Sequence, residues 1–150
     1  MSSEPAEHTR FHDYLRTLSQ VSDADENTII ADVLTDPDHT MADAAILGHL
    51  DRRAATLDDG EAFNTWSQQL AGVLHGRVLP EQRLREWSLI KDIDSGRTRN
   101  TADLVEASDW LQRHLAEHTA SQQALAVLAD QGRTRRIRNS ARARLERRIT

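Results

Sequence analysis

Apolar residues recur at intervals of three and four along almost the whole chain, and polar residues fill the positions between them. This spacing places the apolar side chains on one face of an α-helix. Only three prolines and six glycines interrupt the pattern. It therefore predicts an all-α protein of about eight helices without strands.

The ends of the first three helices are predicted from capping residues and proline. The first helix covers about residues 9–20, and Ser22 or Asp23 caps the second, because a short acceptor side chain satisfies free amides of a first turn. Asp36-Pro37 starts the third, since proline suits the first turn and aspartate suits the cap before it. The predicted buried face of the third helix consists of Met41, Ala44, Ala45, Leu47 and Leu50.

Five more helices follow, separated by breaks that contain glycine, serine, asparagine or threonine. Asp58-Asp59-Gly60 is expected to end the third helix. The fourth then runs to about His75, the fifth from Leu79-Pro80 to Ser95-Gly96, the sixth from Asn100 or Thr101 through Trp110, the seventh from Ser121 to Gly132, and the eighth through Ile137, Ala141 and Leu145.

An Asp-x-Gly triplet occurs three times, and its glycines, Gly60, Gly96 and Gly132, are 36 residues apart. A period of this length is typical of stacked helical hairpins. The breaks would delimit three hairpins with one further helix at either end. However, 36 residues are also ten helical turns, and aspartate with glycine commonly marks helix ends. An irregular helical bundle is therefore the alternative fold.

One segment resembles a known repeat family. Asp36-Pro37-Asp38, followed by Met41, Ala44 and Ala45, is similar to the second-helix entry of HEAT repeats, over about 25 residues. This resemblance implies a short α-solenoid, whose concave surface would receive a peptide or another protein.

Composition predicts one cytoplasmic domain over residues 8–150, preceded by a disordered acidic tail at residues 1–7. Cysteine is absent, which excludes disulfides and thiolate metal sites. The first residues are polar and acidic where a secretory signal is basic and then apolar. No apolar run is long enough for a membrane span, so no membrane partner is expected. Eighteen arginines against a single lysine, Lys91, are typical of a GC-rich bacterial gene.

Charge is distributed unevenly along the chain. Residues 133–148 contain eight arginines and one glutamate, a net charge of +7, whereas the rest of the chain carries −12. The sequence thus indicates an acidic body with a basic C-terminal helix. The segment Gly96-Arg97-Thr98-Arg99 has the same sequence as Gly132-Arg133-Thr134-Arg135, 36 residues later. The candidate binding residues of these turns and of the C-terminal helix are Arg97, Arg99, Arg133, Arg135, Arg136, Arg138 and Arg142, with Arg144, Arg147 and Arg148 nearby.

Three interpretations of these arginines are open. They could dock on the acidic body of the same chain, bind an acidic protein partner, or neutralise the phosphates of a nucleic acid. In a solenoid, Arg99 and Arg135 would lie on one edge and form a shared basic strip. The C-terminal segment contains no aromatic residue for base stacking.

The remaining motifs give little indication of catalysis or ligand binding. His114-Leu115-Ala116-Glu117-His118 resembles the H-x-x-E-H motif of inverted zinc proteases, but it falls at a helix end, where histidines suit the helix dipole. Phosphate-binding glycine loops and a nucleophile elbow are missing from the sequence. The acidic pairs Asp36/Asp38, Asp58/Asp59 and Asp92/Asp94 fit helix capping, and Trp66, Trp87 and Trp110 fit core packing, Trp110 least well.

The sequence therefore predicts no catalytic residue, metal ligand or cofactor. We expect a non-enzymatic interaction or adaptor module whose partner is another protein, with nucleic-acid binding through the arginine-rich helix as the alternative. A metal-dependent hydrolase that uses His114, Glu117 and His118 is a remote third option.

Overall fold

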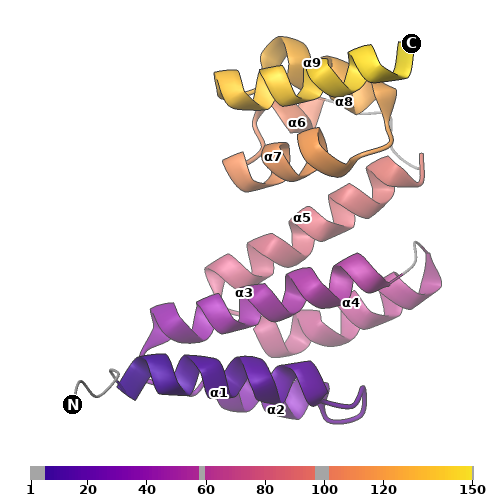
Figure 1. Cartoon of the computed structure of the whole chain (residues 1–150). Helices are drawn as coiled ribbons and strands as arrows, with labels where there is room; N and C mark the ends of the chain where they lie inside the picture. Colours follow the sequence, from indigo (N-terminus) through magenta and orange to yellow (C-terminus); the bar gives the residue numbers. More distant parts are fainter. Residues whose placement is uncertain (1–5, 58–59, 97–101, 150) are drawn as a thin grey trace. The chain divides into compact units, whose positions relative to one another are not determined.

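The computed structural model describes residues 6–57, 60–96 and 102–149. Within these ranges the secondary structure is helical throughout, which confirms the all-α prediction (Figure 1). The helices are α1 (Ala6–Gln20), α2 (Glu26–Val33), α3 (His39–Thr56), α4 (Glu61–Leu74), α5 (Val78–Asp94), α6 (Ala102–Val105), α7 (Asp109–His118), α8 (Gln122–Gln131) and α9 (Arg135–Ile149).

The contacts within the chain group into two units, residues 1–87 and residues 88–150, and the boundary falls inside α5. Each unit is described separately below. The single domain expected over residues 8–150 stays a prediction. The predicted tail, residues 1–7, lies mostly outside the described residues, but α1 already begins at Ala6.

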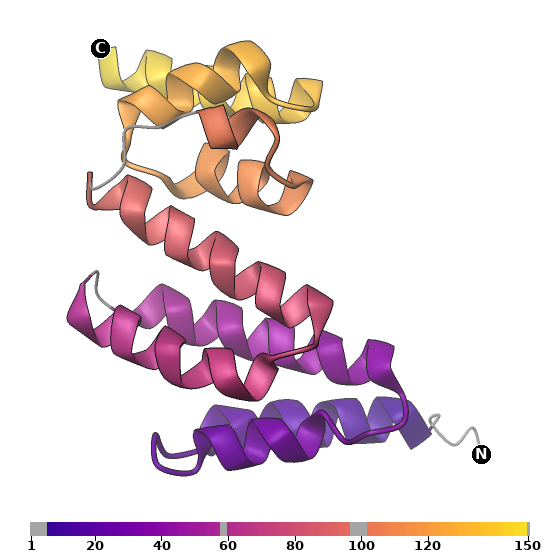
Figure 2. The ribbon, with the colours of Figure 1, turned by 180° about the vertical axis from the view of Figure 1, so that it is seen from behind.

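In unit 1, α1 packs on α2 and α3, and α2 packs on α3 and α4 (Figure 2). Alternate helices thus lie beside each other, and α1 pairs with α2. The predicted hairpins paired the second helix with the third, and α2 and α3 are in contact. They left the first helix as a terminal cap, whereas α1 packs on both α2 and α3. The core consists of fully buried aliphatic side chains, including Leu18, Ile30, Ile46, Leu50 and Leu70. The HEAT resemblance stays a prediction.

In unit 2, α8 packs on α6, α7 and α9, and α9 also packs on α7. One buried polar residue fastens these elements together. Gln112 is fully buried, its side-chain amide donates to the carbonyl of Leu104 at 2.6 Å, and its Oε1 accepts from the backbone N–H of Arg133 at 2.8 Å. The end of α6 and the segment before α9 are therefore held to the same side chain of α7.

Side-chain caps define several helix starts, as the sequence predicts for Ser121. Asp38 accepts from the amide of Met41 at α3, Ser108 from Leu111 at α7 and Ser121 from Ala124 at α8. Asp36 was predicted to cap the third helix, and this was wrong. Its carboxylate instead accepts from Arg10, Tyr14 and the amide of Asp38, which joins α1 to the start of α3.

The predicted sixth helix is divided in two. Because Ser108 has an extended backbone and caps a new helix, the chain breaks between Val105 and Asp109. Trp110 therefore lies in the first turn of α7 rather than in the middle of a helix. In the third helix, Ala44 was predicted to face inward, but it is exposed, and Ile46 and His49 are buried instead.

The three evenly spaced glycines have different conformations. Gly60 has φ +101° and lies at the start of α4 instead of ending the third helix, and Gly96 has φ +75° after α5. Gly132 has φ −56°, which suits any residue, but a Cβ atom there would lie 2.6 Å from the carbonyl oxygen of Leu128 and 2.8 Å from Cγ2 of Ile137. Glycine allows the positive φ at residues 60 and 96, whereas at residue 132 the absence of a Cβ atom allows close packing.

Candidate functional site

The arginines of the C-terminal segment divide into a group that holds unit 2 together and a group that faces solvent. Arg133 belongs to the first group. Its guanidinium donates to the carbonyl of Ala107 at 3.0 Å and pairs with Asp109 at 3.4 Å. Arg138 is half-buried and donates to the carbonyl of Gly132 at 2.7 Å. Both arginines bind groups of their own unit.

Arg144 caps the C-terminal end of α7. Its guanidinium donates to the carbonyl oxygens of Leu115, Ala116 and Thr119 at 3.4, 3.2 and 2.7 Å. The last carbonyls of a helix have no partner within the helix and carry partial negative charge. Arg144 therefore has a structural role in attaching α9 to α7.

Arg135, Arg136 and Arg142 form the second group, called here the arginine face of α9. All three are exposed, and their side chains form no hydrogen bond or ion pair in the part of the chain that the structure describes. Arg135 and Arg142 lie two helical turns apart on one stripe, about 10 Å along the axis, and Arg136 lies about 100° around the helix. The arginine face thus presents three cations to solvent.

Not every predicted binding residue can be placed. Arg97 and Arg99 lie outside the described residues, so the shared basic strip stays a prediction. Arg147 is exposed on α9.

The charge of the two units differs in sign. Residues 88–150 contain twelve Lys and Arg against eight Asp and Glu, a net charge of +4. Residues 1–87 contain seven against sixteen, a net charge of −9. The arginine face therefore lies on a basic unit of an acidic protein.

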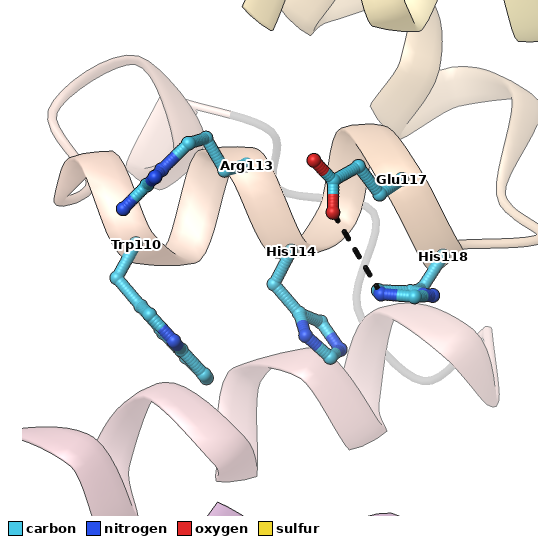
Figure 3. Close-up of a pocket in the computed structure, with 5 residues that line it drawn as sticks. All are labelled: Trp110, Arg113, His114, Glu117 and His118. Atoms are coloured by element: carbon cyan, nitrogen blue, oxygen red, sulfur yellow. Dashed lines mark ion pairs between the residues drawn. The ribbon is translucent and has the colours of Figure 1, made fainter.

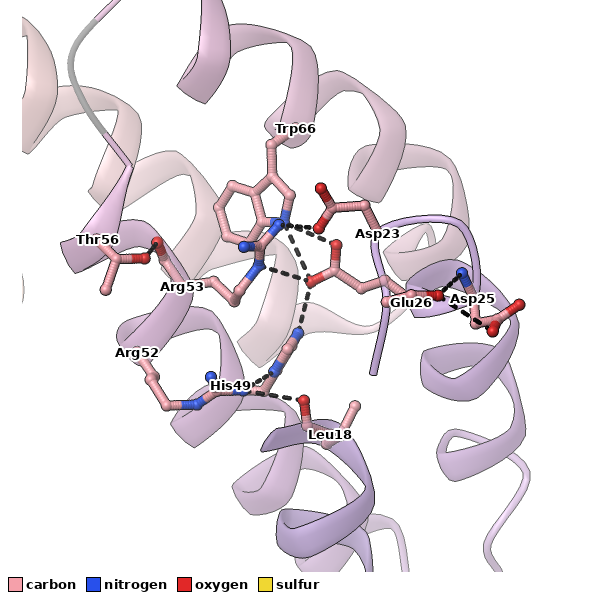
Figure 4. Close-up of polar contacts among 10 residues, drawn as sticks. Leu18, Asp23, Asp25, Glu26, His49, Arg52, Arg53, Thr56 and Trp66 are labelled. Carbon is pink, nitrogen blue, oxygen red and sulfur yellow. Dashed lines mark hydrogen bonds and ion pairs between the residues drawn. The ribbon is translucent and has the colours of Figure 1, made fainter. Parts of the chain in front are cut away.

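A buried carboxylate in unit 1 is the centre of a polar cluster (Figure 4). Glu26, at the start of α2, is 4% exposed. It accepts hydrogen bonds from Nε2 of His49 at 2.6 Å, from the indole of Trp66 at 3.1 Å and from Nε of Arg53 at 3.2 Å. Burial by itself raises the pKa of Glu26, but the bonds from His49 and Trp66 and the charge of Arg53 outweigh it and hold the pKa below its ordinary value.

The two ring nitrogens of His49 have different partners. Nη2 of Arg52 lies 2.9 Å from Nδ1 of His49 and also donates to the carbonyl of Leu18. A guanidinium can only donate, so Nδ1 accepts and the proton lies on Nε2, which donates to Glu26. Arg53 supplies a positive charge that pairs with Glu26.

The buried groups of the Glu26 cluster are bonded to one another. Among the described residues, no buried side-chain nitrogen or oxygen lacks a hydrogen-bond partner. A cavity of about 490 Å³ adjoins the cluster, and two of its lining residues, Glu26 and Arg53, are bonded to each other. Its other polar lining residues include Asp23, Glu61, Thr65 and Gln69. The sequence did not indicate Glu26 or His49 as buried polar residues, and its one signal was a histidine at a helical position between Ile46 and Leu50.

The tryptophans differ in environment. Trp66 and Trp87 are buried, and each donates its indole N–H to a carboxylate, Trp87 to Asp51 at 2.8 Å. Trp110 is only half-buried, and its ring stacks on that of His114 with centroids 5.3 Å apart. The environments therefore match the expectation that Trp110 is the exception.

The H-x-x-E-H motif lies at the end of α7, as expected, and lines a shallow cavity of about 280 Å³ with Trp110 and Arg113 (Figure 3). Glu117 and His118 are exposed, and their Oε2 and Nε2 atoms are 3.9 Å apart. The described residues contain no group of three or more His, Cys, Asp or Glu side chains that could hold a metal ion. The three-ligand site of an inverted zinc protease is therefore missing from this part of the chain.

Comparison with known proteins gave no match among family models, curated proteins or solved structures. No helix in the described ranges has both the length and the apolar character needed to cross a bilayer.

Proposed function

We propose that this protein is a non-enzymatic binding protein, and that the arginine face of α9 docks an acidic segment of a protein partner. The observation that carries the proposal is the exposure of Arg135, Arg136 and Arg142 without a partner among the described residues. Arginine presents a planar fork of donors that matches a carboxylate. Three such groups on one helix suit a partner with several Asp or Glu side chains.

The expected strength of this contact is modest. An exposed ion pair contributes about 0.2–1 kcal/mol, so three pairs contribute at most about 3 kcal/mol. Electrostatics would then direct the encounter and set the orientation, while apolar contacts supply the remaining affinity. Binding should weaken as salt rises, because exposed charges are screened over about 8 Å at 0.15 M.

The overall charge favours an acidic protein segment over a nucleic acid. The chain has a net charge of −5, and residues 1–87 alone carry −9, which repels a long polyanion. Residues 135–149 contain no aromatic side chain that could stack on a base. A short acidic segment needs only the arginine face and avoids this repulsion.

The proposal is tested by fluorescence anisotropy with a labelled glutamate-rich peptide and with labelled mixed-sequence DNA and RNA, each over a salt series. We expect salt-sensitive binding of the peptide that R135E/R142E abolishes. R16E/R85E is the matched control, because it changes the net charge equally at two exposed arginines of unit 1.

Two results would overturn the proposal. Equal loss of peptide binding in the control variant would show that only net charge matters. Tight binding of DNA or RNA without binding of the peptide would replace the protein partner by a nucleic acid.

A further inference from the structure

Two histidines of α7 project from the same side of the helix. Figure 3 shows His114 and His118 beside each other, one turn apart, with Trp110 one further turn toward the start of the helix. The centroids of the two imidazole rings are 4.7 Å apart. His118 is exposed and His114 is half-buried, so solvent reaches the pair.

The separation of the rings fits a shared metal ion. Two imidazoles that bind one tetrahedral Zn²⁺ with bonds of about 2.0–2.1 Å hold their ring centres about 5 Å apart. The observed value of 4.7 Å is close to this, so small side-chain rotations would direct one nitrogen of each ring to a common point. Neutral imidazole is a favoured ligand of Zn²⁺, Cu²⁺ and Ni²⁺.

Neighbouring groups support the pair. The ring of Trp110 lies nearly parallel to that of His114, at 22°, and restricts its rotation. The carboxylate of Glu117, 3.9 Å from Nε2 of His118, adds negative charge beside the pair, whereas Arg113 on the rim of the cavity opposes a cation. Each imidazole has two nitrogens, so one can hold another partner while the other binds the metal, as is usual for ligating histidines.

We propose that His114 and His118 form a two-histidine surface site for a divalent transition-metal ion, with Zn²⁺ and Cu²⁺ as the ions of matching chemistry. Water completes the coordination, because the described residues supply no group of three such ligands. The site therefore lacks the protein ligands of a zinc protease and binds its ion reversibly. It is independent of the arginine face and of the function proposed above.

The test uses untagged full-length protein titrated with Zn²⁺ and, separately, with Cu²⁺ by isothermal calorimetry. We expect one ion per chain and loss of binding in H118Q, which changes an exposed side chain and leaves the fold intact. H8Q/H12Q is the matched control, because His8 and His12 have the same spacing on α1 and are also exposed.

A second measurement locates the ion. Cu²⁺ bound to His114 should quench the fluorescence of Trp110, and W110F should remove that part of the quenching while calorimetric binding persists. Binding that survives H118Q, binding that H8Q/H12Q abolishes, or an absence of binding would each overturn the proposal.

Discussion

Removal of the Glu26 carboxylate should strongly destabilise unit 1. Glu26→Ala leaves the buried N–H groups of His49 and Trp66 without their acceptor. Each buried donor left unsatisfied costs about 1–3 kcal/mol. Breaking a buried ion pair by removing one partner costs about 3–5 kcal/mol. Because the two estimates overlap, we expect the free energy of unfolding to fall by about 3–5 kcal/mol.

The measurement is urea denaturation at neutral pH, followed by far-ultraviolet circular dichroism. Asp32→Ala is the control, since Asp32 is an exposed carboxylate on the same helix. Its effect should stay within about 0.5 kcal/mol.

A double-mutant cycle with Trp66→Phe isolates the indole–carboxylate bond, because phenylalanine keeps a ring and removes the N–H. Trp66→Phe should cost about 1.5–3 kcal/mol in the native background, as expected for a hydrogen bond to a charged group. It should cost clearly less when Glu26 is already alanine. If Glu26→Ala lost less than 1 kcal/mol, or if the two substitutions were additive, the Glu26 cluster would not stabilise the fold as argued.

Three further predictions follow from the described contacts. Gly132→Ala should cost about 1–3 kcal/mol through overpacking. Gly72→Ala is the control and should be neutral or stabilising, because Gly72 is helical and nothing lies within 4 Å of an added Cβ atom. Equal melting temperatures of the two variants would refute the packing argument. Tyr14→Phe should cost about 1.5–3 kcal/mol in urea denaturation, because the phenol donates to the ionised Asp36 at 2.7 Å, and an unchanged midpoint would contradict this. Glu26 has a lowered pKa in the folded protein, so its ionised form should stabilise the fold fully above the ordinary glutamate pKa of 4.5, and this stabilisation should be lost as pH falls below it. Denaturation curves at several pH values should show this dependence of the free energy of unfolding on pH, and Glu26→Gln should remove it.

The helices could be predicted because their signals are local. Apolar spacing and capping side chains act within a few residues, so the start of α8 at Ser121 and the inward side chains of α5 could be predicted from the sequence. Ser108 carries the same signal, but the apolar spacing continues across it from Leu104 to Leu111. The continuous apolar spacing therefore predicted one helix across Ser108, although Ser108 caps the start of α7.

The polar cores could not be predicted because they depend on long-range contacts. Glu26 meets His49, Arg53 and Trp66 only when three helices pack together, and none of these residues is unusual alone. The even spacing of the glycines suggested equivalent positions, but Gly60 and Gly132 have different backbone conformations and different neighbours.

The arginines show the same division. Their density identified α9 as a candidate site, yet density does not separate Arg144, which caps α7, from Arg135, which faces solvent. Only the position of each side chain relative to the neighbouring helix makes that distinction.

The most direct test of the proposed docking surface is nuclear magnetic resonance of the arginine side-chain Nε–H groups during titration with a glutamate-rich peptide. Signals would be assigned by single arginine-to-lysine substitutions. We expect shifts at Arg135, Arg136 and Arg142, and little change at Arg144, whose guanidinium is bonded to carbonyls of α7. Equal shifts at the exposed Arg16 and Arg85 of unit 1, or no shift on α9, would contradict the proposed docking surface.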